Sequence, residues 1–200
     1  MAFTRRGSFG STLRRGNYGS IPRRGVRGSP PAVLAFDTFT QANGTSLGGK
    51  VLDLGGSWTA TAGSGDVQGG QANSITVGTS IFTLDVAVAD VVVSAVGPNN
   101  DSLSLVARLA DDVNYWRLDQ DTVTMDIVEV NAGASTIRAS VPITWTAGDT
   151  LSFECWGTKL LGRLNNTSVQ FTSTFNQTVT RHGMYFAAAS RRLDNFQVTR

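Results

Sequence analysis

The stretch LSLVARLADDVNYWRLDQDTVTMDIVEV, residues 103–130, decides the fold class. Apolar side chains recur at every second position in it, first from Leu103 and again from Trp116. This period of two is typical of a β-strand with one buried face, because successive side chains of a strand point to opposite faces. The turn at Asp111-Asp112 separates these two runs. The stretch therefore predicts antiparallel strands joined by short turns.

The same alternation continues through residues 33–200, and helical spacing is nowhere sustained. The clearest core-facing series are Leu103, Leu105, Ala107 and Leu109, then Trp116 and Leu118, then Val123, Met125 and Ile127, and finally Leu151, Phe153 and Cys155. Turn-forming residues separate the runs at positions 97–100, 131–133, 146–149 and 165–166. Many short strands at this spacing predict an all-β fold, an antiparallel two-sheet β-sandwich of the jelly-roll type. The apolar phase slips after Ile127, which indicates a bulge or a curved central strand.

The composition excludes several classes of protein. Charged residues make up only 16% of the chain, which is too few for a protein of long surface helices. Cys155 is the only cysteine, so neither an intramolecular disulfide nor a cysteine-based zinc site can form. Because the first residues lack an apolar run of signal-peptide length and no later segment could span a bilayer, we expect synthesis in a reducing cytoplasm and no membrane partner.

Several short motifs follow one another along residues 33–200. They are FDTF at 36–39, NGTSLG at 43–48, LVAR at 105–108, NYWRL at 114–118, AGD at 147–149, LSF at 151–153, GMYFA at 183–187 and LDNFQV at 193–198. In this order they resemble the concanavalin A-like lectin/glucanase superfamily, in the LamG-like form found in phage virion and bacterial surface proteins. The resemblance implies two curved antiparallel sheets, paired terminal strands and a concave face that often binds sugars. It does not imply catalysis.

Residues 1–32 differ sharply from the rest. Three nine-residue units repeat without gaps, namely RRGSFGSTL from Arg5, RRGNYGSIP from Arg14 and RRGVRGSPP from Arg23. Residues 1–31 carry seven arginines and no acid, whereas the remainder carries 10 basic and 15 acidic residues. Paired glycines and prolines oppose helix and strand, so this segment is predicted to be an extended N-terminal arm without an independent fold.

An arm of this kind takes a fixed shape only where a partner supplies contacts, because ordering costs roughly 1 kcal/mol or more per residue. We predict that it binds acidic surfaces of neighbouring subunits through Arg5, Arg6, Phe9, Arg14, Arg15, Tyr18, Arg23, Arg24 and Arg27. A solvated tail and an RNA-binding tail of RGG type are the alternatives. Nucleic acid is the weaker one, since two aromatic residues are few for stacking and the remaining chain adds no basic stripe.

The sequence offers no convincing catalytic set, and we expect no enzyme. Asp126 and Glu129 are the acidic pair closest to a glycosidase pattern, but a spacing of three puts them on opposite faces of a regular strand. His182, the only histidine, is expected in a loop or at a strand edge, and Cys155 in the core. No cofactor is expected. Calcium is the one metal considered, from acidic residues near turns or terminal strands, Asp37, Asp111, Asp112 and Asp194.

Candidate glycan-binding residues lie out of phase with the predicted core. Tyr115, Arg117 and Asp119 share one face of their strand, and Glu154 and Trp156 share the outer face of another. Aromatic rings stack on sugars, while Arg and carboxylate groups bond sugar hydroxyls. The alternative is that neighbouring loops or a second subunit cover these residues.

Together these features favour a non-catalytic bacteriophage virion protein, either a minor tail protein or a capsid cement or decoration protein. We expect it to be assembled in the host cytoplasm in many copies, with virion proteins as partners through the arm and a host surface glycan as a further ligand. The alternatives are a bacterial carbohydrate-binding module or lectin-like protein and an RNA-associated protein that uses the arm. The step from fold to virion rests on analogy.

Overall fold

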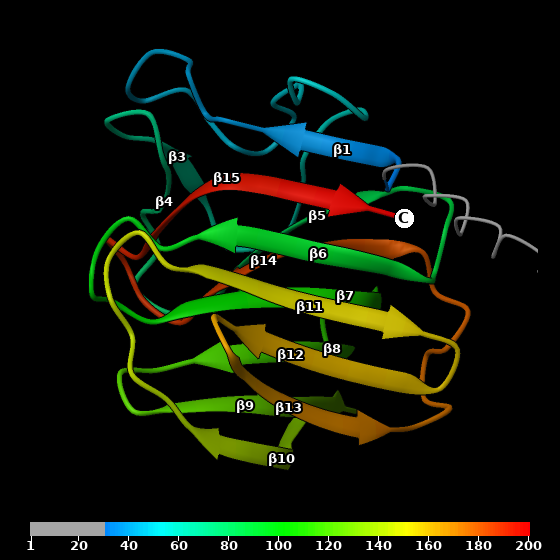
Figure 1. The fold of residues 1–200 in the computed structure, drawn as a ribbon. Helices are drawn as coiled ribbons and strands as arrows, with labels where there is room; N and C mark the ends of the chain where they lie inside the picture. The colour runs from blue at the N-terminus through cyan, green and yellow to red at the C-terminus, as the bar shows by residue number, and fades with distance from the viewer. Residues whose placement is uncertain (1–30) are drawn as a thin grey trace, which may run out of the picture. The chain divides into compact units, whose positions relative to one another are not determined.

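The computed structural model describes residues 31–200 of the chain. This part contains fifteen β-strands, joined by turns and loops, and no helix. Since it contains no helix, this part has none that could cross a membrane. The strands form two antiparallel sheets, so the predicted all-β sandwich is confirmed (Figure 1). The predicted arm residues fall outside the described residues: Arg5, Arg6, Phe9, Arg14, Arg15, Tyr18, Arg23, Arg24 and Arg27.

The eight-stranded sheet lies toward the viewer in Figure 1 and has the order β13-β12-β11-β6-β15-β4-β3, with β1 also paired to β15. Its strands are β1 (Val33–Asp37), β3 (Gly65–Val67), β4 (Ala72–Ser74), β6 (Val91–Val96), β11 (Thr150–Trp156), β12 (Lys159–Leu164), β13 (Thr167–Thr172) and β15 (Arg192–Thr199). The first and last strands pair antiparallel, as the family resemblance implied.

The seven-stranded sheet lies behind it in the order β10-β9-β8-β7-β14-β5-β2. Its strands are β2 (Thr59–Ala62), β5 (Ser80–Asp85), β7 (Leu103–Asp111), β8 (Asn114–Gln120), β9 (Thr124–Asn131), β10 (Ala134–Pro142) and β14 (Arg181–Phe186). β14 reaches its place between β7 and β5 from the far end of the chain, so the middle of this sheet combines distant parts of the sequence.

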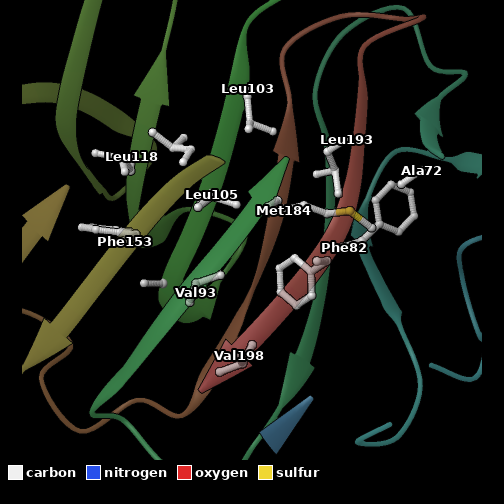
Figure 2. Close-up of a cluster of buried hydrophobic side chains, with 14 of the residues drawn as sticks. Ala72, Phe82, Val93, Leu103, Leu105, Leu118, Phe153, Met184, Leu193 and Val198 are labelled. Atoms are coloured by element: carbon white, nitrogen blue, oxygen red, sulfur yellow. The ribbon is translucent and has the colours of Figure 1, made fainter. Parts of the chain in front are cut away.

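The main core lies between the two sheets (Figure 2). Side chains from both sheets belong to one buried cluster, among them Val93, Phe153 and Val198 from one sheet and Leu105, Leu118 and Met184 from the other. The predicted alternation is thereby confirmed for the central strands. Burial of each such side chain contributes about 1.5–3 kcal/mol, which makes this cluster the main source of stability.

Two predicted core positions behave differently. Val123 lies in the turn before β9 and is 61% exposed. Leu109 is buried, but in a second cluster on the outer face of the seven-stranded sheet. The cause is a bulge in β7, where Arg108 has a φ of +52° and the pairing with β8 shifts between Ala107 and Asp111. Three residues of β7, 108–110, lie against the single residue Tyr115 of β8, and the left-handed conformation of Arg108 turns Leu109 to the outer face, so the prediction for Leu109 was wrong.

The phase slip in β9 has another explanation. The pairing of β8 with β9 runs without a shift from Tyr115 opposite Val130 to Gln120 opposite Met125, so β9 itself is not bulged. The bulge at this point lies in the neighbouring strand β10, whose register shifts between Ile137 and Ala139, opposite Val128 and Ile127. Val128 and Val130 instead join the second apolar cluster on the outer face. Both faces of the sheet are apolar at this point, which hides the alternation in the sequence.

One polar cluster is buried at the end of β1. The Asp37 carboxylate is fully buried and accepts hydrogen bonds from Lys50 Nζ at 2.7 and 2.6 Å and from Trp58 Nε1 at 2.6 Å. The backbone N–H of Phe39 donates a further bond at 3.0 Å. The charge of Lys50 is therefore neutralised inside the fold, and the segment between β1 and β2 is fixed to the core.

Candidate functional site

Strand β8 positions three of the predicted glycan-binding residues. Trp116 and Leu118 enter the core, so alternation sends Tyr115, Arg117 and Asp119 to the outer face of the seven-stranded sheet. The shared face that the sequence predicted for these three residues is confirmed.

Tyr115 serves mainly in packing. It is only 4% exposed and belongs to the second apolar cluster, with Ile81, Val106, Leu109, Val128 and Val130. Burial raises the pKa of its phenol above the ordinary value, an effect that the nearby Arg117 charge partly opposes. Tyr115 thus forms part of an apolar floor beside the polar residues of this face.

Arg117 is held in place by two neighbours. Its Nε lies 2.6 Å from Asp119 Oδ1, an ion pair whose geometry is not that of an aligned hydrogen bond. Its guanidinium carbon lies 4.2 Å from the centroid of the Tyr185 ring, a cation–π contact. Burial raises the pKa of Asp119, while the Arg117 charge acts in the opposite direction.

These groups line a shallow pocket of about 180 Å³. In register across the sheet, Asp119 lies opposite Ser104 of β7 on one side and Asp126 of β9 on the other. The lining residues are Ser102, Ser104, Arg117, Asp119, Gln120, Asp121, Asp126, Tyr185 and Ala187. The pocket therefore presents carboxylate, hydroxyl and guanidinium groups beside an aromatic ring, which suits a ligand rich in hydroxyl groups.

The other two predicted residues lie elsewhere. Glu154 and Trp156 belong to β11, on the outer face of the eight-stranded sheet. Glu154 pairs with Arg163 of β12, and Trp156 is 42% exposed. The five candidates thus form two groups on opposite sides of the sandwich, and the structure does not bring them into one site.

The acidic pair considered for glycoside hydrolysis is separated by the sheet itself. Asp126 lies on the outer face, in the pocket, whereas Glu129 has the same parity as the core residue Ile127 and pairs with Arg138 of β10 at 3.1 Å. The expected placement on opposite faces is confirmed. The single-strand arrangement that would let both carboxylates flank one glycosidic bond is not formed.

His182 was predicted in a loop or at a strand edge, and this was wrong. It is the second residue of β14, an inner strand, and is fully buried. Its Nε2 lies 2.9 Å from the carbonyl oxygen of Val88, and its Nδ1 accepts a hydrogen bond from the backbone N–H of Arg108 at 3.4 Å. Burial lowers the pKa of the imidazole to about 4. Cys155 is buried as predicted, which raises the pKa of its thiol to about 12.

Three of the four acidic residues considered for calcium, all except Asp112, have other partners. Asp37 is bound to Lys50, Asp111 accepts hydrogen bonds within its turn from Val113 and Asn114, and Asp194 accepts one from the backbone of Asn195. Among residues 31–200, no three His, Cys, Asp or Glu side chains are grouped to hold a metal ion.

A larger hollow of about 440 Å³ lies between the loops around residues 87–90 and 177–180, next to Arg200. Its lining is mostly small or neutral, and its one acidic side chain, Asp90, is already bound by Arg108 at 3.0 Å. The pocket beside Arg117 gathers more charged side chains, so we regard that pocket as the candidate site.

Comparison with known proteins places this architecture in a class. No family model and no curated protein matches the sequence. Among solved structures, the carbohydrate-binding module CBM66 from Bacillus subtilis has a TM-score of 0.59 at 14% identity, over 72% of this chain and 95% of that one. A Bacillus subtilis protein of unknown function with a galectin-like fold has a TM-score of 0.57 at 10% identity, over 84% and 96%.

The Bacillus licheniformis β-glucanase gives a TM-score of 0.52 at 11% identity, over 86% of this chain and 99% of that one. These three neighbours share the two-sheet β-sandwich architecture of this chain. More specifically, the fold is that of the concanavalin A-like lectins and glucanases, which confirms the resemblance found in the sequence. At such low identity the likeness establishes the fold alone.

Sequence reasoning missed part of the site. Ser104, Asp121 and Tyr185 were not predicted, and Asp126 was considered only as a catalytic residue. Ser104 and Asp126 reach the pocket through strand register, and Tyr185 through the placement of β14 beside β7. No local pattern in the sequence shows the register between strands or the placement of β14 beside β7.

Proposed function

We propose that this chain is a non-catalytic bacteriophage virion protein, a minor tail protein or a capsid cement or decoration protein, whose sandwich binds host glycans. The observation that carries the glycan part is the polar pocket beside Arg117 on the outer face of the seven-stranded sheet. It lies on a fold shared with a carbohydrate-binding module.

The chemistry of the pocket supports sugar binding. Carboxylate oxygens accept hydrogen bonds from sugar hydroxyls, and the groups are held before a ligand arrives because Arg117 is fixed by Asp119 and Tyr185. The volume of about 180 Å³ is below the roughly 300–1,000 Å³ typical of sites for drug-sized ligands. A single sugar residue at the end of a glycan suits this size better than a long chain.

The lack of catalysis is proposed on the placement of the carboxylates. Asp126 and Glu129 lie on opposite faces of β9, whereas a retaining glycosidase needs two carboxyl groups about 5 Å apart that flank the bond. Incubation with a panel of oligosaccharides is expected to give no hydrolysis. Turnover that is lost in a Glu129→Gln variant contradicts this part of the proposal.

Filling the pocket tests the glycan site directly. Ala187 lines the pocket and is exposed, so Ala187→Trp adds a large ring there without disturbing the core. On a glycan array, and then by titration calorimetry with the best ligand, we expect affinity to fall at least about ten-fold, equivalent to about 1.4 kcal/mol.

The matched control is Trp156→Ala, which removes the exposed aromatic residue of the other sheet and is expected to leave binding unchanged. The reverse result, with binding lost in Trp156→Ala and kept in Ala187→Trp, moves the site to the eight-stranded sheet and contradicts the assignment.

The virion part of the proposal rests on the sequence of the arm. Residues 1–31 concentrate seven arginines and no acid, a composition suited to docking onto acidic neighbouring subunits. We expect the full chain to co-sediment with virus particles from its source, and a variant lacking residues 1–32 to remain folded but stay in the supernatant. A truncated chain that still co-sediments, or an arm peptide that binds RNA with steep salt dependence, overturns this role.

A further inference from the structure

We infer that the pocket beside Arg117 selects uncharged or amine-bearing saccharides and excludes anionic ones such as uronic acids and sialic acid. This inference rests on the proposed function, because it specifies the ligand class of the same site. It follows from how the charges of the pocket are distributed among their partners.

The one cation of the pocket is already engaged. Arg117 forms an ion pair with Asp119 at 2.6 Å and places its guanidinium against the Tyr185 ring at 4.2 Å. Its side chain is only 13% exposed. An incoming carboxylate would have to displace Asp119 from a half-enclosed pair, which leaves that acidic group without its partner.

Two further carboxylates, Asp121 and Asp126, have no cationic partner among residues 31–200. Asp126 accepts hydrogen bonds from the hydroxyls of Ser140 and Thr124, and Asp121 accepts bonds from the backbone N–H groups of Val123 and Thr124 at 2.7 Å each. All these donors are neutral. Neither carboxylate takes part in any of the ion pairs found in residues 31–200.

Asp121 is ionised at neutral pH. Burial opposes its ionisation, but the hydrogen bonds from Thr124 and Val123 outweigh that effect and hold the pKa of Asp121 below its ordinary value. With Arg117 and Asp119 paired to each other, the lining holds two carboxylates without a counter-charge, Asp121 and Asp126. Sugar hydroxyls and ammonium groups donate hydrogen bonds to such carboxylates, whereas a carboxylate on the ligand is repelled.

The size of the effect can be bounded. A unit charge about 6 Å from another in a water-like dielectric changes an equilibrium constant about three-fold, so two of them change it about ten-fold. We therefore expect a neutral oligosaccharide to bind at least about ten-fold more tightly than its uronic-acid counterpart at low salt. The ratio shrinks at high salt, since the screening length falls to about 3 Å at 1 M.

The experiment uses the full chain on an array of matched neutral, amine-bearing and acidic oligosaccharides. The best neutral ligand and its uronic-acid counterpart are then compared by calorimetry at low and high salt. In Asp126→Asn, which removes one of the two charges at nearly constant shape, the neutral-to-acidic affinity ratio is expected to fall about three-fold. In the control Glu154→Gln, on the other sheet, it stays constant.

The outcomes distinguish the preference for neutral or amine-bearing sugars from glycan binding itself. Preference for neutral or amine-bearing sugars that weakens in Asp126→Asn supports the inference. Acidic glycans that bind as tightly as neutral ones, or more tightly, overturn the inference and leave the glycan-binding function standing. No binding to any class overturns the glycan-binding function and this inference with it.

Discussion

Asp37→Ala is expected to lower the free energy of unfolding by about 3–5 kcal/mol, the usual loss when one partner of a buried ion pair is removed. The substitution leaves the ammonium group of Lys50, whose side chain is 2% exposed, without a counter-charge. It also removes the acceptor of the Trp58 indole N–H. Urea denaturation followed by far-UV circular dichroism measures the change.

A double-mutant cycle separates the charge from the packing. Lys50→Met alone is expected to destabilise, because Asp37 then stays buried and charged, whereas Asp37→Leu combined with Lys50→Met costs less than the sum of the single changes. As a surface comparison, Glu154→Gln breaks the exposed pair with Arg163 and is expected to cost less than about 1 kcal/mol. An Asp37→Ala loss as small as that of Glu154→Gln rules out a structural role for the buried pair.

The sequence predicted the elements of the fold better than the contacts between them. Alternation from Leu103 and from Trp116 predicted strands that are present, because burial on one face of a sheet leaves a period of two in the chain. The prediction failed at Leu109, where the bulge at Arg108 reverses the faces. A single residue in the left-handed conformation has no marker in the sequence when it is not glycine or asparagine.

The contacts of buried polar groups were the second feature that the sequence did not predict. Asp37 was considered a turn or terminal-strand residue, and nothing marked Lys50 and Trp58, 13 and 21 positions further on, as its partners. The prediction of the candidate site was incomplete for the same reason. Tyr115, Arg117 and Asp119 follow from alternation along one strand, but the register that brings Ser104 and Asp126 to the same pocket is a property of strand pairing.

His182 is expected to make the protein lose stability in mild acid. Burial lowers the pKa of its imidazole from 6.5 to about 4 in the folded chain, so the unfolded chain binds a proton first as the pH falls. The stability is complete above pH 6.5 and is lost progressively between 6.5 and 4, at about 1.4 kcal/mol per pH unit and about 3 kcal/mol in all.

The carboxyl groups with shifted pKa values give a different dependence of stability on pH. Burial raises the pKa of Asp119 and Asp194, which opposes the loss, because a folded carboxyl with a raised pKa binds its proton more readily than the unfolded one. Asp53 and Asp85 have lowered pKa values, chiefly through hydrogen bonds from Thr38 and Thr180, and lose their contribution near and below their ordinary value of 3.8. Since His182 is the only histidine, it alone acts strongly between pH 6.5 and 5.

The measurement is urea denaturation at half-unit steps from pH 7.5 to 4.5, on the natural chain and on His182→Gln. The variant is expected to be less stable at pH 7, because the bonds to Val88 and Arg108 are weakened, but to show a nearly flat profile between pH 6.5 and 5. An equally steep profile in both proteins assigns the acid sensitivity to other groups.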